Sequence, residues 1–153
     1  MDLFNYSRRE TSVVHVGNVE VGGSNPVRVQ SMTNTATQDT EACVEQAKRI
    51  IDAGADYVRL TTQGIKEAEN LRNINAELRK QGYLNPLVAD VHFTPKVADV
   101  AALYAEKVRI NPGNYLDAPR TFKQVDYTDE EYAVELQKIR ERLVEFLAIC
   151  KEN

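Results

Sequence analysis

The chain has 153 residues, of which 42% are hydrophobic and 27% are charged, and its formal net charge is −4. This size is typical of one domain, and the acidic balance favours neither nucleic acid nor an anionic membrane as a partner. No apolar run approaches the roughly 20 residues that span a bilayer, and the first residues lack the pattern of a secretory signal or transit peptide, so we expect a cytoplasmic protein.

Strand and helix patterns alternate along the chain from residue 13 onwards. Short runs rich in β-branched residues separate longer segments in which apolar residues return every three or four positions, as they do on one face of a helix. In chain order the sequence predicts a hairpin over 13–21 with its turn at Gly17-Asn18, a strand over 27–32, a helix over 39–53, a strand over 57–60, a helix over 65–81, a strand over 87–91, a helix beginning at Thr94-Pro95, a strand over 107–110 and a long helix ending at about Cys150.

Cap residues mark the ends of these helices. Thr37 or Asp39 suits the N-cap of the first helix, and Gly54 is placed to end it in the left-handed conformation. Thr128 and Glu131 have the spacing of a capping box at the start of the long helix. The apolar stripe expected along that helix consists of Tyr132, Leu136, Ile139, Leu143, Phe146 or Leu147, and Cys150.

This order of elements predicts an α/β fold. Strands that alternate with amphipathic helices favour a parallel sheet with right-handed crossovers. Four such units are half of a (β/α)₈ barrel, which typically needs about 250 residues. We therefore predict the N-terminal half of a TIM barrel, preceded by a β-hairpin, over residues 1–114. Residues 115–153 are predicted to be a connection and a long helix that lead to a remainder this sequence lacks.

Polar side chains gather where the predicted strands end. In parallel α/β folds, the carboxyl ends of the strands surround a common mouth in which ligands bind. The residues at these positions are Gln30, Ser31, Arg59, Asp90, His92, Arg109 and Asn111. Arg59 and Arg109 indicate an anionic ligand, because guanidinium groups hold phosphate bidentately. Asp90 and His92 are two apart on one strand, point the same way, and could orient a hydroxyl, shuttle a proton or bind a metal.

The two cysteines, Cys43 and Cys150, lie far apart in the sequence, and neither belongs to a CxxC pair. We predict that both are buried thiols in helices. Two cysteines are too few for a [4Fe–4S] cluster, which generally takes about four thiolates or close substitutes. The sequence therefore predicts no metal ligands in this chain, and we interpret His15, on the hairpin, as structural.

Four stretches in these strands and loops carry a family resemblance. They are VGNVEVGGSNPVRVQSMTNT, GADYVRL, PLVADVHF and VRINPGN. In this order they resemble the successive motifs of the 4-hydroxy-3-methylbut-2-enyl diphosphate synthases, over nearly all of residues 8–114. The tail FKQVDYTDEEY resembles the longer connection of the subgroup shared by some bacteria and plants, and the bacterial side is expected.

The resemblance implies a TIM-barrel substrate domain and a separate C-terminal domain, absent here, that carries a [4Fe–4S] cluster. Enzymes of this family act in the methylerythritol phosphate pathway of isoprenoid biosynthesis. They reductively open 2-C-methyl-D-erythritol 2,4-cyclodiphosphate to 4-hydroxy-3-methylbut-2-enyl diphosphate, take electrons from ferredoxin or flavodoxin, and form homodimers. Because the family's cluster ligands match no residue of this chain, we expect the chain by itself to be inert.

The motifs also imply roles for individual residues. The implied substrate-binding residues are Arg59, Arg109, Asn111, Ser31 and Thr33, of which the two arginines would hold the diphosphate. Asp90 and His92 are the implied catalytic residues, lining the pocket near the sugar-derived carbons. Two alternatives stay open: another phosphate-ester barrel, such as one resembling dihydropteroate synthase, and a non-catalytic half-barrel that binds a diphosphate or pairs with another half.

Overall fold

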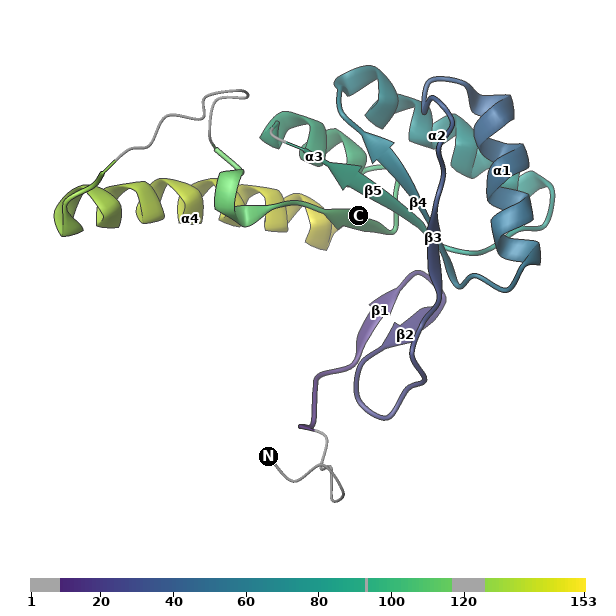
Figure 1. The fold of residues 1–153 in the computed structure, drawn as a ribbon, viewed down its shortest axis with the longest axis horizontal. Helices are drawn as coiled ribbons and strands as arrows, with labels where there is room; N and C mark the ends of the chain where they lie inside the picture. Colours follow the sequence, from purple (N-terminus) through teal and green to yellow (C-terminus); the bar gives the residue numbers. More distant parts are fainter. Residues whose placement is uncertain (1–8, 93, 117–125) are drawn as a thin grey trace.

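A computed structural model describes residues 9–92, 94–116 and 126–153. These residues form a small hairpin, a four-stranded parallel sheet and helices that follow the strands (Figure 1). The elements are β1 (Val14–Val16), β2 (Val19–Val21), β3 (Gln30–Met32), α1 (Thr40–Asp52), β4 (Tyr57–Thr62), α2 (Ile65–Lys80), β5 (Leu87–Val91), α3 (Pro95–Ala101), β6 (Lys107–Arg109), a short 3₁₀ helix η1 (Pro112–Asn114) and α4 (Asp129–Glu152). Residues 1–8, Phe93 and residues 117–125 lie outside the described residues, and the last of these ranges belongs to the predicted connection. The predicted boundary after residue 114 stays a prediction.

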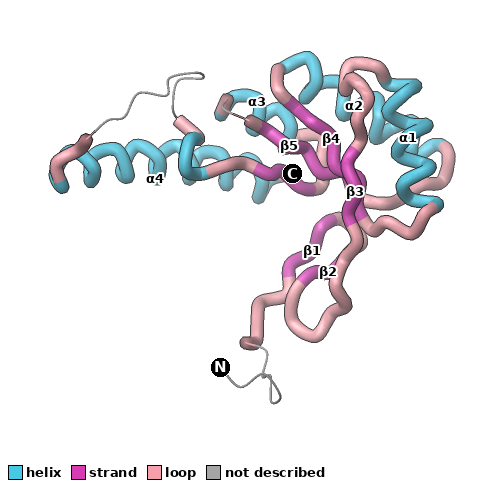
Figure 2. The backbone as a smooth tube through the Cα atoms, viewed as in Figure 1, coloured by secondary structure: helices cyan, strands magenta, loops and turns pink. Residues whose placement is uncertain are grey.

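The parallel sheet has the strand order β3-β4-β5-β6, which is the order of these strands along the chain. Each strand is joined to the next through a helix, as in successive units of a (β/α)₈ barrel. The predicted α/β fold, half of a TIM barrel preceded by a β-hairpin, is therefore confirmed. Figure 2 shows the helices α1, α2 and α3 along one side of the strands and the hairpin beyond the strands' starting ends.

The face of the sheet that carries these helices, the outer face, is mostly apolar and buried. Val58, Leu60, Leu87 and Ala89 are all fully buried there. The matching stripe of α2 is fully buried too, which confirms the helical period read from the sequence; it consists of Ala68, Leu71, Ile74 and Leu78. This single core fixes the strands, and so it fixes the side chains that the strands carry on their other face.

The hairpin covers the start of the opposite, inner face of the sheet. Gly17 has φ +55° and makes the predicted turn between β1 and β2. Val16 packs against Tyr57 and Val88, the inward-facing residues near the starts of β4 and β5. All five residues of β5 are buried, because helices cover one face and the hairpin covers part of the other.

The predicted caps are confirmed for α1. The Asp39 carboxylate accepts a hydrogen bond from the Ala42 N–H at 3.0 Å, so Asp39 is the N-cap. Thr37 has a different role, since its hydroxyl donates to the Thr61 carbonyl at 2.6 Å. Gly54 follows the helix with φ +99°, in the left-handed region that favours glycine.

The strand β3 is shorter than predicted, with three residues in place of the six over 27–32. The segment before β3 is held by a side chain, because the Asp56 carboxylate accepts a hydrogen bond from the Val29 N–H at 2.7 Å. Val27 is 83% exposed, so the β-branched run alone does not make a strand at the edge of the sheet. β-propensity depends on a neighbouring strand and on burial, and the described residues supply neither for Val27.

The helix α4 begins at the predicted capping box of Thr128 and Glu131. Its predicted apolar stripe is only partly right. Phe146 is buried and lies 6.3 Å from the Tyr115 ring, but Leu147 is 59% exposed. The stripe residues Tyr132 and Leu136 and the thiol residue Cys150 are also exposed.

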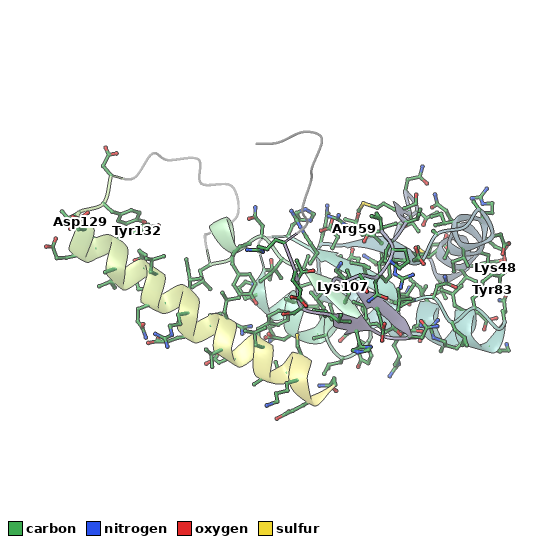
Figure 3. All side chains as sticks on the ribbon, turned by 90° about the horizontal axis from the view of Figure 1, so that it is seen from below. Lys48, Arg59, Tyr83, Lys107, Asp129 and Tyr132 are labelled. Carbon is green, nitrogen blue, oxygen red and sulfur yellow. The ribbon has the colours of Figure 1, made fainter. Side chains whose placement is uncertain are left out.

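The prediction that both cysteines are buried is therefore wrong for Cys150 and confirmed for Cys43. The reason is the way α4 packs. Its C-terminal half contacts α3, with an ion pair between Arg142 and Asp99, while its N-terminal half extends away from the sheet. Figure 3 labels Asp129 and Tyr132 at that far end of the helix.

Candidate functional site

The inner face of the sheet carries the polar side chains that the sequence singles out. In a parallel sheet, residues that are partners in register point to the same face, and side chains alternate along each strand. Arg59 is the partner of Val88, while Thr61 is the partner of Asp90 and Asp90 of Arg109. Arg59, Asp90 and Arg109 therefore share the inner face, and the apolar residues between them point into the core with the helices.

The buried carboxylate of Asp90, on β5, contacts an arginine on each neighbouring strand, β4 and β6. Asp90 Oδ2 lies 2.7 Å from Arg59 Nη2, and Asp90 Oδ1 lies 3.2 Å from Arg109 Nη1. The Asp90 side chain is only 4% exposed, whereas Arg59 and Arg109 are 26% and 39% exposed. We call Arg59, Asp90, His92 and Arg109 the Asp90 cluster.

The charges of the Asp90 cluster do not cancel. A buried carboxylate needs charged or hydrogen-bonding partners, and the two guanidinium groups meet that need. Two arginines against one aspartate leave a net positive charge even when His92 is neutral. Each guanidinium has five N–H donors in a planar fork, more than a single Asp90 oxygen can accept. The arrangement is suited to an anion with several oxygen atoms, such as a phosphate or diphosphate.

Arg59 lies deeper in the sheet than predicted. It is the third of the six residues of β4, not a residue at the end of that strand. The ladder continues past it because Thr61 and Thr62 pair with Asp90 and Val91. Arg109, by contrast, is the last residue of β6, as expected.

His92 follows directly after β5 and joins the cluster, as its spacing from Asp90 predicts. Its Nε2 atom lies 3.9 Å from Asp90 Oδ2 and 3.3 Å from Arg109 Nη1. The second contact is a hydrogen bond only when Nε2 carries no proton, because Arg109 can donate but not accept. The imidazole is 36% exposed, so it is the member of the pair with Asp90 that reaches the surface of the cluster.

The three other residues with implied substrate-binding roles do not join the Asp90 cluster. Asn111 is exposed, and its side-chain oxygen accepts a hydrogen bond from the Gly113 N–H at 3.2 Å. Ser31 is the partner of Val58 in register, so it points to the outer face, where it lines a hollow beside α1. Thr33 is buried, and its N–H donates to the Arg59 carbonyl at 2.9 Å. Their roles as substrate contacts stay predictions.

Thr61 and Lys107 lie on the inner face and were not among the predicted site residues. Thr61 is the register partner of Asp90, and Lys107 is the partner of Val88. The Lys107 ammonium lies 5.5 Å from the centre of the Tyr57 ring, and Figure 3 labels Lys107 and Arg59 in the central part of the molecule. The signal that could have found both was the two-residue period, since Thr61 follows Arg59 by two positions and Lys107 precedes Arg109 by two.

A second ion-pair network lies at the opposite, amino end of the strands. Glu106 accepts hydrogen bonds from the Leu87 N–H at 2.8 Å, Asn75 Nδ2 at 3.1 Å and Arg79 Nη2 at 2.7 Å. Burial by itself would raise the pKa of Glu106, but these hydrogen bonds outweigh it and hold the pKa below its ordinary value. The network ties the loop before β6 to the start of β5.

Comparison with known proteins accounts for the half-barrel. The sequence profile described as "GcpE TIM-barrel domain" matches residues 11–152, almost the whole chain. The chain belongs to this family. The match includes the hairpin, all four parallel strands and α4.

Curated relatives of the GcpE family resemble the chain over its whole length. A protein of Bacteroides fragilis (strain YCH46) is 78% identical over 153 residues, which are 100% of this chain and 24% of the relative. Proteins of Parabacteroides distasonis and Akkermansia muciniphila are 60% and 47% identical, over 100% and 98% of this chain and 25% and 26% of their own length. All three are named 4-hydroxy-3-methylbut-2-en-1-yl diphosphate synthase (flavodoxin). The chain thus spans about a quarter of the length of the curated relatives it matches.

The cysteines of this GcpE-family chain do not fit an iron–sulfur cluster. Cys43 is buried in α1, where its thiol donates to the Ala36 carbonyl and lies 3.1 Å from the Thr35 hydroxyl. Cys150 is exposed on α4. Neighbouring protein atoms partly desolvate its thiol and so raise the pKa of that thiol, and burial raises the pKa of the Cys43 thiol in the same way. Within the described residues, no group of three or more histidine, cysteine, aspartate or glutamate side chains could hold a metal ion.

None of the helices in the described part of the chain is long and apolar enough to cross a membrane. The longest, α4, has 24 residues, but charged residues recur throughout its length.

Proposed function

We propose that this chain forms part of the substrate-binding barrel of a 4-hydroxy-3-methylbut-2-enyl diphosphate synthase. The whole protein would reductively open 2-C-methyl-D-erythritol 2,4-cyclodiphosphate to 4-hydroxy-3-methylbut-2-enyl diphosphate, in isoprenoid precursor biosynthesis. The observation that carries the proposal is the Asp90 cluster, in which two guanidinium groups on the inner face surround one buried carboxylate. The names of the relatives support the same reaction.

Within this proposal, Arg59 and Arg109 bind the diphosphate through the N–H donors that Asp90 does not occupy. Asn111, which is exposed and follows Arg109 by two positions, would add a contact. His92 faces the sugar-derived carbons, because it is the more exposed member of its pair with Asp90. Thr33, in the loop between β3 and α1, and Ser31, in β3, would be secondary substrate contacts, since neither side chain lies in the cluster.

The remaining parts of the proposal concern the whole protein. We propose that it is a cytoplasmic bacterial homodimer that takes electrons from flavodoxin, the donor in the relatives' names, or from ferredoxin. The reduction would need a [4Fe–4S] cluster held by residues other than those described here. This chain alone would then be inert, and its own contribution is to bind, neutralise and orient the diphosphate.

The test is binding of inorganic pyrophosphate, by calorimetry, to a full-length member of the family that carries these residues. Arg109→Met should raise Kd by about tenfold or more, because a hydrogen bond to a charged group is worth roughly 1.5–3 kcal/mol. Lys80→Met is the matched control, since Lys80 is 76% exposed and lies on α2, on the outer side of the sheet. Equal Kd values for Arg109→Met and the wild type would contradict the proposed function.

A further inference from the structure

Asp90 has surroundings that a direct ligand-binding role does not explain. Its side chain is 4% exposed, and each of its two oxygens is already within hydrogen-bond distance of a different arginine, Arg59 at 2.7 Å and Arg109 at 3.2 Å. The arginines and His92 are the exposed members of the cluster, so a ligand on the inner face would meet them before it met Asp90.

By charge alone, Asp90 opposes the proposed ligand. A carboxylate beside an anion site lowers the affinity of that site for a diphosphate, and its burial adds a cost of desolvation. The benefit must therefore be geometric. Arginine has a long side chain that loses much rotational freedom when it is fixed, and a binding site gains affinity when that loss occurs before the ligand arrives.

We infer that Asp90 is a positioning residue that holds Arg59 and Arg109 in one fixed arrangement for a diphosphate group. This inference rests on the proposed function and deepens it. Asp90 comes from β5, the strand between those that carry the two arginines, so its two oxygens reach to both sides. The fixed arrangement holds both guanidinium groups beside one ligand position, and a diphosphate, which has more charge and more oxygen atoms than a single phosphate, can use both groups more fully.

The experiment measures Kd of inorganic pyrophosphate, and of inorganic phosphate, for the full-length protein with Asp90→Asn. This change raises the positive charge of the site while it keeps the size of the side chain. If Asp90 positions the arginines, Kd of pyrophosphate rises about five- to fiftyfold despite the added positive charge, and Kd of phosphate changes less. An unchanged or lower Kd of pyrophosphate would overturn the inference.

A second variant guards against a trivial loss of folding. Asp90→Glu keeps the charge and displaces the carboxylate by one methylene group, so the inference expects it to weaken pyrophosphate binding with no change in net charge. Wild-type affinity in Asp90→Glu would overturn the inference. If neither variant folds, as judged by thermal unfolding, Asp90 serves the fold rather than the ligand, and the inference is likewise overturned.

The variant Arg109→Met separates this inference from the proposed function. If it leaves pyrophosphate binding unchanged, the proposed diphosphate site itself fails. If it weakens binding while Asp90→Asn does not, the site stands and only the positioning role fails. Asp90→Asn should raise Kd of pyrophosphate less in the Arg109→Met background than in the wild type, because only one of the two arginines that Asp90 positions, Arg59, is then left.

Discussion

Asp90 and Glu106 are both carboxylates paired with arginine near the parallel strands, yet their partners differ in kind. Glu106 accepts hydrogen bonds from the backbone N–H of Leu87 and from the side chains of Asn75 and Arg79. Asp90 forms ion pairs with the side chains of two arginines and lies near His92. The first carboxylate is tied to the backbone, and the second is surrounded by long side chains whose ends reach the surface.

The two networks also differ in whether their cations are fully used. Arg79 donates to Glu106 and to the carbonyls of Tyr83 and Asn85, at 2.6 and 3.1 Å, so its guanidinium joins three parts of the fold. At the Asp90 cluster, positive groups outnumber the carboxylate. We call the Glu106 network closed, because its one arginine binds three parts of the fold and its charges balance. A closed network stabilises the structure, whereas a cluster with excess positive charge is available to a ligand.

The largest expected effect is on the closed network. Glu106→Gln should lower the free energy of unfolding by about 2–4 kcal/mol, because the amide keeps only one acceptor oxygen and presents a donor to either the Leu87 N–H or Arg79, and because the charge that pairs with Arg79 is lost. Urea denaturation measures this. If Glu106→Gln also raises Kd of pyrophosphate, the separation of a stabilising network from a ligand-binding cluster is wrong, since Glu106 would then contribute to ligand binding.

The matched control for this change is Glu77→Gln on α2. Glu77 pairs with Lys80 and accepts a hydrogen bond from Gln81 at the surface, so Glu77→Gln should lower the free energy of unfolding far less than Glu106→Gln does. A loss as large as that of Glu106→Gln would show that any acidic side chain near α2 has the same effect.

A smaller effect is expected from pH. The folded-state pKa of Glu106 lies below its ordinary value of 4.5, so the unfolded chain binds this proton more readily than the folded chain. The stability that Glu106 contributes is present in full above about pH 4.5 and is lost as the pH falls through the lower folded-state pKa. Urea denaturation of the wild type and Glu106→Gln should show their difference narrowing below pH 4.5. A constant difference down to pH 3 would contradict the prediction.

The smallest expected effect is on pyrophosphate binding when Lys107, on the inner face, is replaced. Lys107 lies over the Tyr57 ring, nearer the hairpin than the Asp90 cluster. Lys107→Met should weaken pyrophosphate binding only about two- to threefold, through the loss of one nearby positive charge in a solvated site. Calorimetry in parallel with Arg109→Met measures this. An effect equal to that of Arg109→Met would extend the ligand site toward the start of the strands.

Several features of the chain could be read from local sequence alone. The alternation of strands and helices, the buried stripe of α2, the turn at Gly17 and the caps at Asp39 and Thr128 are all confirmed. Each depends on residues within a few positions of one another, so the chemistry that decides it is present in a short stretch of chain. Arg59, Asp90, His92 and Arg109 were identified for the same reason, because polar residues interrupt apolar strands at those positions.

Features that depend on distant neighbours were decided by the tertiary structure. Ser31 and Arg59 both belong to predicted strands, but register sends the first to the helices and the second to the inner face. Cys150 is exposed because α4 packs with Phe146 in the core that α3 also lines. The sequence could not decide whether Phe146 or Leu147 would be the buried residue. The meeting of two arginines on one buried aspartate needs three strands side by side. The sequence by itself determined which residues alternate and where helices end, since those are local preferences. Only packing and strand register decided which side chains meet.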